Sequence, residues 1–557
     1  MGERIFVGVA WPYASGPRHL GHVAGAYLPA DIFARYHRAK GNEVLMVSGS
    51  DEHGTPITIK AEQEGKKPAE VATKYHEQFV DTFRKLGISF DLYTSTETAN
   101  HAEVTHDFFL TLLKKGYIYK DTVSQAYCPR CQRFLTDRYV EGTCPICKFT
   151  PARGDQCDQC GRPLNPAELI APRCRLCGTT PVFRDSEHFF FKLSAFRDRL
   201  LEWVKPQNHW KPNVYNFTLH YLEEGLKDRA ITRDIEWGIS IPLPGFESKR
   251  IYVWFEAVVG YLSASKEWAK ISGDGEKWRS FWRGGDVRSY YFIGKDNIVF
   301  HTIIWPAMLM GYEGLNLPYD VPANEFLTFE SKKLSTSRNW AVWLPDYLSR
   351  YAPDPLRYML SINMPENTDT DFSWREFFRR NNDELVATYG NLVHRVLTFV
   401  YRNFDGAVPT PGEFDGCSQT ILDKARDTLK TVDELIYKCH LKDAIKSAMT
   451  LAQEANRYLD KKSPWKTIKQ DRQASATALY TAISVLSCLK TVLYPFLPFS
   501  SQKLHNYLGF KGNVADSGWQ FVPPPSGQKL QPPEPLFVKL DEKLVEEEEA
   551  SQMGQEA

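Results

Sequence analysis

The stretch that decides the fold reads Ala10-Trp11-Pro12-Tyr13-Ala14-Ser15-Gly16-Pro17-Arg18-His19-Leu20-Gly21-His22. A short apolar run at 5–10, biased toward β-branched residues, precedes it and predicts a buried strand. Residues 27–40 follow with apolar side chains on one helical face, and Gly41 is a typical helix stop. A strand that ends in a turn and then feeds a helix places the turn at the carboxyl edge of a sheet, where open α/β sheets bind ligands.

His19 and His22 lie three residues apart at the predicted start of the helix, so both imidazoles can point the same way. The first helical turn also offers unpaired backbone N–H groups and a positive dipole end, which suit a triphosphate. Two such histidines are equally compatible with one capping the helix and the other packing in the core. The complete pattern Pro-Tyr-x-x-Gly-x-x-His-Leu-Gly-His resembles the ATP-binding signature of class I aminoacyl-tRNA synthetases, and this resemblance implies the phosphate site.

Length and composition indicate a large soluble protein of several domains. The chain has 557 residues, 43% of them hydrophobic and 24% charged, and its formal net charge is zero. Any contact with a nucleic acid must therefore come from local basic patches. The longest apolar runs, such as 303–310, are too short to span a bilayer, and the N-terminal residues lack the charged-then-apolar pattern of a signal segment. We expect a cytoplasmic protein without a membrane partner.

A second apolar strand at 44–48 ends in Gly49-Ser50-Asp51-Glu52-His53-Gly54. In a βαβ unit its carboxyl edge lies beside that of the first strand, which brings Asp51 to the ligand crevice. Asp51 is a candidate to hold a substrate ammonium, and it is also a suitable helix N-cap; both roles are compatible.

Eight of the eleven cysteines lie between positions 128 and 177, in four Cys-x-x-Cys pairs. Two such pairs complete a tetrahedral zinc site, so four pairs predict two structural zinc ions. Thioredoxin-like redox chemistry uses one pair after a strand and is disfavoured. We favour a nested arrangement, in which the inner pairs close one site and the outer pairs meet at its base. The inner ligands are Cys144, Cys147, Cys157 and Cys160, and the outer ligands are Cys128, Cys131, Cys174 and Cys177.

The α/β pattern returns after this insertion. Residues 250–254 and 290–294 are predicted strands, and Asp296 after the second can accept both ribose hydroxyls of a nucleotide or cap a helix. A predicted strand at 325–329 leads into a loop, 330–338, that contains two lysines, four hydroxyl residues and an arginine. Such a loop can wrap a polyphosphate, although its composition alone is also that of an exposed polar turn.

From position 382 onward the pattern is helical, at 384–401, 418–437, 441–459 and 475–493, and predicts an α-bundle. Asn391 and Arg395 share one helix, and Trp465 lies in a basic turn. Exposed aromatics and arginines stack on unpaired bases, whereas the alternative for Trp465 is packing between helices. The Pro-rich stretch 523–535 is interpreted as a linker, and the acidic run at 546–549 predicts a disordered tail.

The ordered set of these motifs resembles methionyl-tRNA synthetases, a family of class I aminoacyl-tRNA synthetases, over nearly the whole chain. The resemblance rests on the stretch at 12–22, Ser50-Asp51-Glu52-His53-Gly54, the cysteine pairs, Tyr252-Val253-Trp254, Phe292-Ile293-Gly294-Lys295-Asp296 and the loop at 333–337. It implies that ATP activates L-methionine to methionyl-adenylate, which is then transferred to the 3′ end of tRNA(Met), initiator and elongator alike.

The resemblance also implies site residues and partners. His19, His22 and Lys333 are the expected catalytic residues, and Mg²⁺ is expected with ATP. The expected ATP-binding residues are His19, Gly21, His22, Gly294, Asp296, Lys333 and Thr336. The expected methionine-binding residues are Trp11, Tyr13, Asp51, Trp254, Val258, Tyr261, Asn297 and His301. Asn391, Arg395 and Trp465 are expected to read the anticodon.

The implied architecture is a Rossmann-like class I catalytic domain, split by a zinc-knuckle connective insertion and followed by an all-α anticodon-binding bundle. We place the two catalytic halves at 1–122 and 246–325, the insertion at 123–245, and a stem-contact region with the Lys-Leu-Ser-Thr-Ser loop at 326–383. The anticodon domain takes 384–535 and the tail 536–557.

Two departures from the family pattern stand out. The lysine-rich loop usually carries a second lysine where this chain has Thr336. The chain also lacks the C-terminal tRNA-binding domain through which many members dimerise, so we expect a monomer.

A cofactor-forming adenylyltransferase with the same histidine signature would need neither the cysteine pairs nor the bundle. A non-catalytic tRNA-binding relative is supported by Thr336 alone. A leucine, isoleucine or valine synthetase would usually carry a large editing insertion, and a cysteine enzyme fits the cysteine pairs and the Trp254 region less well.

Overall fold

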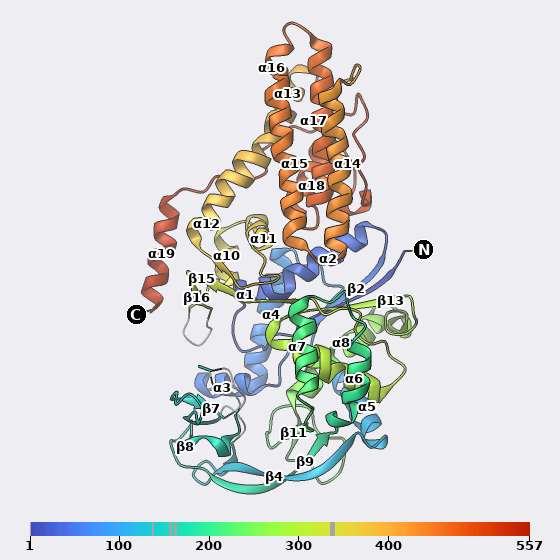
Figure 1. Cartoon of the computed structure of the whole chain (residues 1–557). Coiled ribbons are helices and arrows are strands. Elements are labelled where there is room, and N and C mark those ends of the chain that lie inside the picture. The colour runs from blue at the N-terminus through green and yellow to red at the C-terminus, as the bar shows by residue number, and fades with distance from the viewer. Residues whose placement is uncertain are drawn as a thin grey trace.

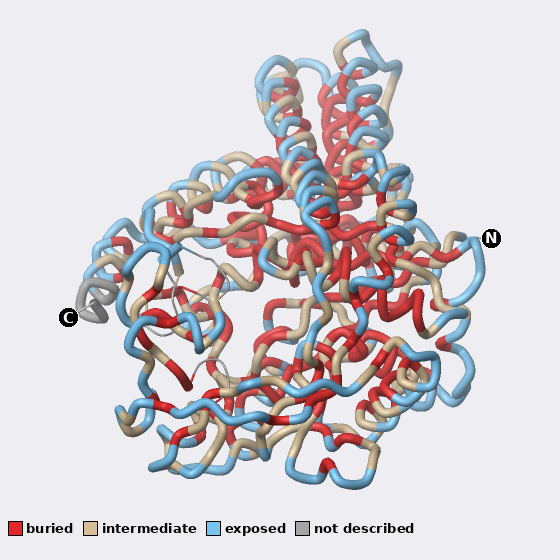
Figure 2. Tube along the Cα trace, turned by 60° about the horizontal axis from the view of Figure 1, so that its bottom comes forward, coloured by how far each residue is buried: buried red, intermediate tan, exposed pale blue. Residues whose placement is uncertain are grey.

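The computed structural model describes residues 2–135, 139–154, 157, 159–160, 164–334 and 340–556, with side chains up to position 550. A central α/β domain carries an insertion with the clustered cysteines at one end and a column of long helices at the other (Figure 1). The predicted fold class is therefore confirmed. Buried residues are concentrated in the sheet and along the axis of the helical column (Figure 2).

A five-stranded parallel sheet forms the centre of the molecule, in the order β14-β13-β1-β2-β3. Its strands are β1 (Arg4–Val9), β2 (Glu43–Ser50), β3 (Leu92–Ser95), β13 (Val287–Gly294) and β14 (Ala323–Asn324). From β1 the chain moves outward to β2 and β3, and it later returns to β13 on the other side of β1. The strand order therefore reverses between β1 and β13, and this switch point is where such sheets bind ligands.

Helices cover both faces of the sheet, so alternate residues of β1 enter two different cores. Ile5, Val7 and Val9 pack in one core, and Phe6 packs in the other. The covering helices and their adjoining turns are α1 (Leu20–His22), η1 (Val23–Tyr27), α2 (Leu28–Ala39), α3 (Thr55–Glu64), α4 (Pro68–Leu86), α5 (Ala99–Lys114), α8 (Val253–Ile271), η5 (Lys277–Phe281), η6 (Lys295–Asn297), η7 (Phe300–Ile304) and α9 (Trp305–Tyr312).

Residues 250–254 do not form the predicted strand. Only β12 (Arg250–Ile251) is extended, and α8 begins at Val253, so Trp254 lies in the first turn of a helix. The prediction was wrong because α8 is largely buried: an apolar helix that is covered on most sides shows no clear helical period, and its β-branched and aromatic residues resemble a strand.

The insertion is carried by a long antiparallel ribbon of β4 (Ile118–Cys128) and β9 (Val182–Phe191), paired from Ile118↔Phe191 to Tyr127↔Val182. The knuckles lie between these strands, with β5 (Arg133–Phe134), β6 (Val140–Thr143), β7 (Ala152–Arg153), η3 (Pro166–Glu168) and β8 (Ile170–Cys174). The chain returns through η4 (Leu193–Phe196), α6 (Arg197–Val204), α7 (Pro212–Glu223), β10 (Arg229–Ala230) and β11 (Thr232–Arg233).

A small region joins the sheet to the helical column. It contains β15 (Leu327–Phe329), β16 (Lys332–Lys333), β17 (Thr370–Phe372), α10 (Leu344–Arg350), α11 (Pro353–Ile362) and α12 (Trp374–Arg379). The buried Arg357 of α11 binds the Asp31 carboxylate of α2 at 2.6 Å and donates to the carbonyl oxygens of Pro495 and Phe496. One guanidinium thus links three parts of the chain.

The predicted α-bundle is present at the C-terminal end. Its elements are η8 (Arg380–Gly390), α13 (Asn391–Asn403), α14 (Gly416–Tyr437), α15 (Leu441–Lys462), α16 (Pro464–Thr467), α17 (Arg472–Leu493), α18 (Pro498–Tyr507) and η9 (Val514–Ser517). By length and composition α17 is apolar enough to cross a membrane, but 94% of its apolar window is buried inside the protein. It is the core helix of the bundle.

The predicted disordered tail at 536–557 is corrected by the structure. Leu536 and Phe537 are buried, and α19 (Lys543–Glu556) packs against α12. Glu548 pairs with Arg350 and accepts a hydrogen bond from the Tyr351 hydroxyl at 2.7 Å. The acidic run predicted disorder because like charges repel, whereas arginines on another part of the chain neutralise it here.

Candidate active site and metal centres

A cavity of about 260 Å³ lies at the carboxyl ends of β1 and β13. The expected nucleotide residues His19, Gly21, His22, Gly294, Asp296 and Lys333 all line it, although they come from three separate parts of the sequence. Thr336 lies outside the described residues. The cavity therefore coincides with the topological switch point of the sheet, and the sequence motifs converge on it.

The two signature histidines are held as a close, tilted pair with defined tautomers. His19 caps α1, and its Nδ1 accepts from the Gly21 N–H at 3.2 Å; the Nδ1 of His22 accepts from the His19 N–H at 3.2 Å. Their ring centroids are 3.7 Å apart. An imidazole whose Nδ1 accepts carries its proton on Nε2, so each ring is a neutral N–H donor. Burial lowers the pKa of His19 to about 3 and holds that of His22 well below its usual range.

Close packing explains why glycine is needed at position 21. A Cβ atom there would lie 2.8 Å from the Leu334 side chain and 3.1 Å from the His19 ring. Leu334 follows Lys333 in the loop that closes this side of the cavity. A side chain at position 21 would therefore push the histidines and the lysine loop apart.

Two lysines lie around an aromatic ring at the cavity. The Lys333 Nζ lies 5.0 Å from the ring centroid of Phe326, and the Lys295 Nζ lies 4.2 Å from it. Lys295 is held by Glu325 at 2.7 Å and Asp369 at 2.8 Å. Two ammonium groups beside the cavity suit an anionic ligand, because lysines act as point charges on phosphates.

The expected methionine residues form a neighbouring cluster, and Trp11 and Asn297 also line the cavity. The Trp254 Nε1 donates to the Tyr13 hydroxyl at 3.2 Å, and the Tyr261 hydroxyl bonds to the Nε2 of His301 at 2.7 Å. Burial lowers the pKa of His301 to about 4, so the ring is neutral. Its Nδ1–H donates to the Asn297 carbonyl oxygen, because that oxygen can only accept. Val258 is buried on α8 beside this group. Trp254, Val258, Tyr261 and His301 do not line the cavity itself.

Two glycines make room for Trp11. A Cβ atom at Gly49 or at Gly260 would lie 2.5 Å or 2.8 Å from the indole ring. Trp11 is therefore wedged between the end of β2 and helix α8, and it also lines the cavity.

Asp51 lies where the βαβ argument predicted, beside the first signature. Its backbone accepts from the Ala14 N–H and donates to the Pro12 carbonyl oxygen, both at 2.8 Å, and it forms a parallel bridge with Tyr13. The side chain is 4% exposed. Burial and the nearby Glu256 raise the pKa of Asp51 well above its usual range, while His53 opposes the shift. Asp51 does not line the cavity.

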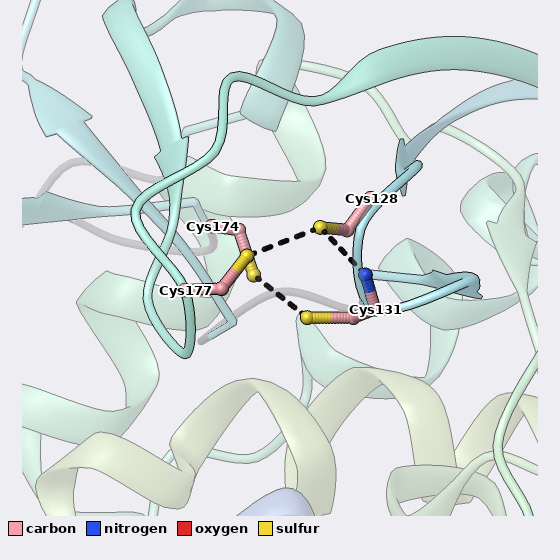
Figure 3. A group of neighbouring side chains, drawn as sticks. All are labelled: Cys128, Cys131, Cys174 and Cys177. Carbon is pink, nitrogen blue, oxygen red and sulfur yellow. Dashed lines mark hydrogen bonds between the residues drawn. The ribbon is translucent and has the colours of Figure 1, made fainter.

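The eight clustered cysteines form two groups, with the nested pairing that the spacing predicted. In the outer group the Sγ atoms of Cys128 and Cys177 are 3.4 Å apart and those of Cys131 and Cys174 are 3.9 Å apart (Figure 3). In the inner group the Cys144–Cys160 and Cys147–Cys157 separations are 4.0 and 3.5 Å. Four sulfurs at about 2.3 Å from a tetrahedral zinc ion would be about 3.8 Å apart, so both groups can hold a metal ion.

The expected anticodon residues meet at the far end of the bundle. Asn391 and Arg395 lie one turn apart on α13, and the Arg395 guanidinium lies 4.4 Å from the Trp465 ring centroid. Trp465 is partly exposed and packs partly on the bundle core, as the packing alternative predicted. Its stacking on an anticodon base stays a prediction.

Several residues of the site had no assigned role in the sequence analysis. Gly25 and Tyr27 line the cavity from a π-helical turn, and Glu325 and Phe326 line it from the other side. His301 also lies on a π-helical turn, η7. Lys295 belongs to the motif Phe292-Ile293-Gly294-Lys295-Asp296, and this motif was the one sequence signal that pointed to its place beside the cavity. The π turns leave no period that a sequence pattern reveals, and such turns often occur at functional sites.

Comparison with known proteins agrees with this geometry. Residues 5–397 match the family model described as tRNA synthetases class I (M), and residues 408–557 match the anticodon binding domain of methionyl tRNA ligase. A Methionine--tRNA ligase of Dehalococcoides mccartyi is 64% identical over 550 residues, which cover 99% of each chain. One of Thermomicrobium roseum is 53% identical over 582 residues and the whole of both chains.

The crystal structure of Mycobacterium tuberculosis methionyl-tRNA synthetase bound by methionyl-adenylate superimposes with a TM-score of 0.80 at 26% identity, over 97% of this chain and 100% of that one. A split parallel sheet, with a histidine pair and a lysine loop at its switch point, defines a class I aminoacyl-tRNA synthetase. Within that class the two family models and the full-length relatives agree on methionine as the amino acid. The chain belongs to the methionyl-tRNA synthetase family, whose activity is the ATP-dependent ligation of methionine to tRNA.

Proposed function

We propose that this chain activates methionine in the cavity at the switch point and then charges tRNA(Met), with the residues assigned below. The observation that carries the assignment is the convergence of His19, His22, Asp296 and Lys333 on one cavity. The methionine carboxylate attacks the α-phosphorus of ATP, the bond to the β-phosphate oxygen breaks, and pyrophosphate leaves. This step needs charge stabilisation more than covalent help.

In this assignment His19 and His22 act as neutral donors through Nε2–H. Their Nδ1 atoms are already engaged with the backbone, so both rings are preorganised and need no rearrangement when charge develops on the phosphates. Lys333 is exposed on β16 and contributes its charge to the β- and γ-phosphates, with ATP entering as its Mg²⁺ complex. Gly21 and Gly294 allow close approach, Asp296 holds the ribose, and Thr336 adds a hydroxyl contact.

Asp51 is assigned to the methionine ammonium. Trp11, Tyr13, Trp254, Val258, Tyr261, Asn297 and His301 are assigned to the side-chain pocket. An aromatic, apolar slot suits a polarizable thioether. One missing methylene changes binding by only about 1–3 kcal/mol, so homocysteine is expected to compete.

The remaining assignments concern the rest of the molecule. We assign a structural zinc ion to each cysteine group, because four thiolates leave no open position for a substrate. Asn391, Arg395 and Trp465 are assigned to the anticodon of tRNA(Met). The proposed domain limits are those given by the sequence, except that the anticodon domain extends to include α19. We propose a cytoplasmic monomer; none of the eleven cysteines forms a disulfide, as a reducing compartment favours.

Methionine-dependent exchange of pyrophosphate into ATP tests the proposal. We expect clear exchange in the wild type and a decrease of roughly 10²–10³-fold in kcat for Lys333→Ala, because one preorganised charged donor is lost. Lys446→Ala, on the surface of the bundle, is the matched control and should keep the wild-type rate.

Thr336→Lys is a third arm. Wild-type exchange within a few-fold of this variant would show that Thr336 is tolerated. Absence of exchange in the wild type with rescue by Thr336→Lys would contradict the proposal and indicate a scaffold retained for binding. Exchange that leucine supports as well as methionine would contradict the substrate.

A further inference from the structure

A buried chain of charged groups lies beneath the proposed ammonium site. His53, two residues after Asp51, is 3% exposed and lies between two carboxylates that come from distant parts of the sequence. Its Nδ1 is 2.9 Å from the Oε2 of Glu256, and its Nε2 bonds to the Oε1 of Glu97. Both ring nitrogens therefore face acceptors, which requires a proton on each and a positively charged ring.

The surroundings agree with this charge. Burial opposes protonation of His53, but the charges and hydrogen bonds of Glu256 and Glu97 outweigh it and raise the pKa of His53 to about 10. Glu256 is fully buried, and although burial opposes its ionisation, His53 lowers the pKa of its carboxyl. The two residues thus form a buried ion pair, in which each group is charged because the other one is.

The ion pair joins the two sides of the proposed methionine site. His53 follows Asp51, and its backbone N–H donates to the Asp51 Oδ1 at 3.4 Å. Glu256 is in the first turn of α8, two residues after Trp254, whose indole bonds to Tyr13. Removal of the pair would therefore affect the strand end that carries Asp51 and the helix that carries the aromatic wall.

The charges around Asp51 decide how it can act. Glu52, Glu97 and Glu256 are acidic, His53 is the cation between the last two, His101 approaches Glu256 at 3.8 Å, and Arg233 lines the same small cavity as His53 and Glu256. Burial lowers the pKa of His101, so it is neutral. Without the His53 charge, buried carboxylates would repel one another until one of them took up a proton.

We infer that His53 and Glu256 are positioning residues for methionine: their buried ion pair fixes the strand end and the first turn of α8 around Asp51, so that the Asp51 side chain is aligned to accept the substrate ammonium. The inference rests on the proposed role of Asp51. Neither residue lines the nucleotide cavity, so they act through Asp51 and not on ATP.

The test compares ligands with and without the ammonium. For His53→Gln, which retains the backbone donor and the approximate size but not the charge, KM for methionine should rise roughly ten- to hundredfold. KM for ATP should stay within a few-fold of wild type, and kcat at saturating methionine should largely recover. Inhibition by 4-(methylthio)butanoate, which is methionine without its ammonium, should not change.

Two further variants keep the result interpretable. Glu256→Gln retains an acceptor for His53 without its charge, and KM for methionine should rise selectively but less. His188→Gln is the matched control: His188 is also buried and bonded to a carboxylate, Asp234 at 2.9 Å, but it belongs to the insertion and should leave KM unchanged.

Unchanged KM for methionine in His53→Gln would overturn the inference, as would an equal loss of methionine and 4-(methylthio)butanoate, which would indicate a damaged pocket. Asp51→Asn separates this outcome from failure of the proposed function. If Asp51→Asn binds methionine normally, the ammonium site itself is wrongly assigned. If Asp51→Asn is impaired and His53→Gln is not, only the positioning role fails.

Discussion

Buried histidines in this molecule adopt opposite charge states, and the neighbouring residues decide which. His53 is charged because it lies between two carboxylates. His37 is also buried, but its neighbours are the rings of Phe33 and Tyr36 and the side chain of Asn42. Burial therefore lowers the pKa of His37 to about 3. The residue types are identical, so the contacts alone set the charge.

The neutral state of His37 predicts a pH-dependent stability. An unfolded histidine binds a proton below about pH 6.5, whereas native His37 binds one only near pH 3, so the unfolded state gains protons in between. The contribution of His37 to stability is therefore present above pH 6.5 and declines as the pH falls. We expect the stability advantage of the wild type over His37→Gln, measured by urea unfolding, to shrink by about 2 kcal/mol between pH 6.5 and 4.5.

The comparison with the variant isolates this histidine, because buried acids such as Asp320 contribute equally to both proteins. A stability difference that stays constant over this pH range would mean that His37 is protonated in the native state.

At the scale of elements, the knuckles are too small to fold by apolar burial alone. Their core contains Ala126, Leu135, Tyr139, Val140, Ala152, Leu169 and four of the cysteines. A core of this size does not offset the conformational entropy of the loops around it, and metal binding supplies the missing free energy in such units. The ribbon of β4 and β9, in contrast, is paired along its whole length and does not depend on a metal.

We therefore expect two zinc ions per chain by elemental analysis. Cys157→Ser should reduce the content to one, because the outer group shares no ligand with the inner one. Cys417→Ser is the matched control, since Cys417 lies on α14 in the bundle and should leave two. A single zinc ion in the wild type, or two in Cys157→Ser, would contradict the assignment.

At the scale of the whole molecule, one helix connects the cavity with the bundle. The signature turn enters α2, whose Tyr36 hydroxyl and Lys40 ammonium contact the Asp433 carboxylate of α14 at 2.8 Å each. Arg357 ties the same helix to α11 and to the end of α17 through Asp31 and Pro495. The bundle is therefore held against the catalytic domain, while α13 and α16, which carry the residues proposed to read the anticodon, lie at the opposite end (Figure 1).

This separation predicts that the two partial reactions can be uncoupled. Trp465→Ala should raise KM for tRNA in the charging reaction by roughly ten- to hundredfold, since a base stacked on an aromatic ring contributes about 1–3 kcal/mol. Pyrophosphate exchange should be unchanged, because it does not use tRNA. The control is Arg472→Ala. It breaks a contact between Arg472 and the Phe404 ring of the same bundle, which is similar to the contact between Arg395 and Trp465, and it is expected to behave as wild type. Equal effects of Trp465→Ala on exchange and charging would indicate a structural role for the ring.

Features that depend on near neighbours in the sequence were predictable. The first βα unit and the placement of Asp51 beside Tyr13 follow from the alternation of an apolar strand, a turn and a helix. The nested cysteine pairing follows from spacing, because short loops bring the inner pairs together first. Errors occurred where a local pattern is ambiguous. The fully covered start of α8 resembled a strand, and the acidic α19 resembled a disordered tail.

By itself the sequence determined the class of fold, the histidine signature, the Cys-x-x-Cys pairs and the helical character of the C-terminal half. Each of these features depends on residues that lie within a few tens of positions of one another. Only the tertiary structure decided which distant groups meet. Lys333 reaches the histidine cavity from about three hundred residues away, and Glu256 pairs with His53 across 203 positions. Such contacts depend on how whole elements pack, and the charge of a buried side chain depends in turn on those contacts. For that reason the charged state of His53, and with it the environment of Asp51, is a property of the folded protein.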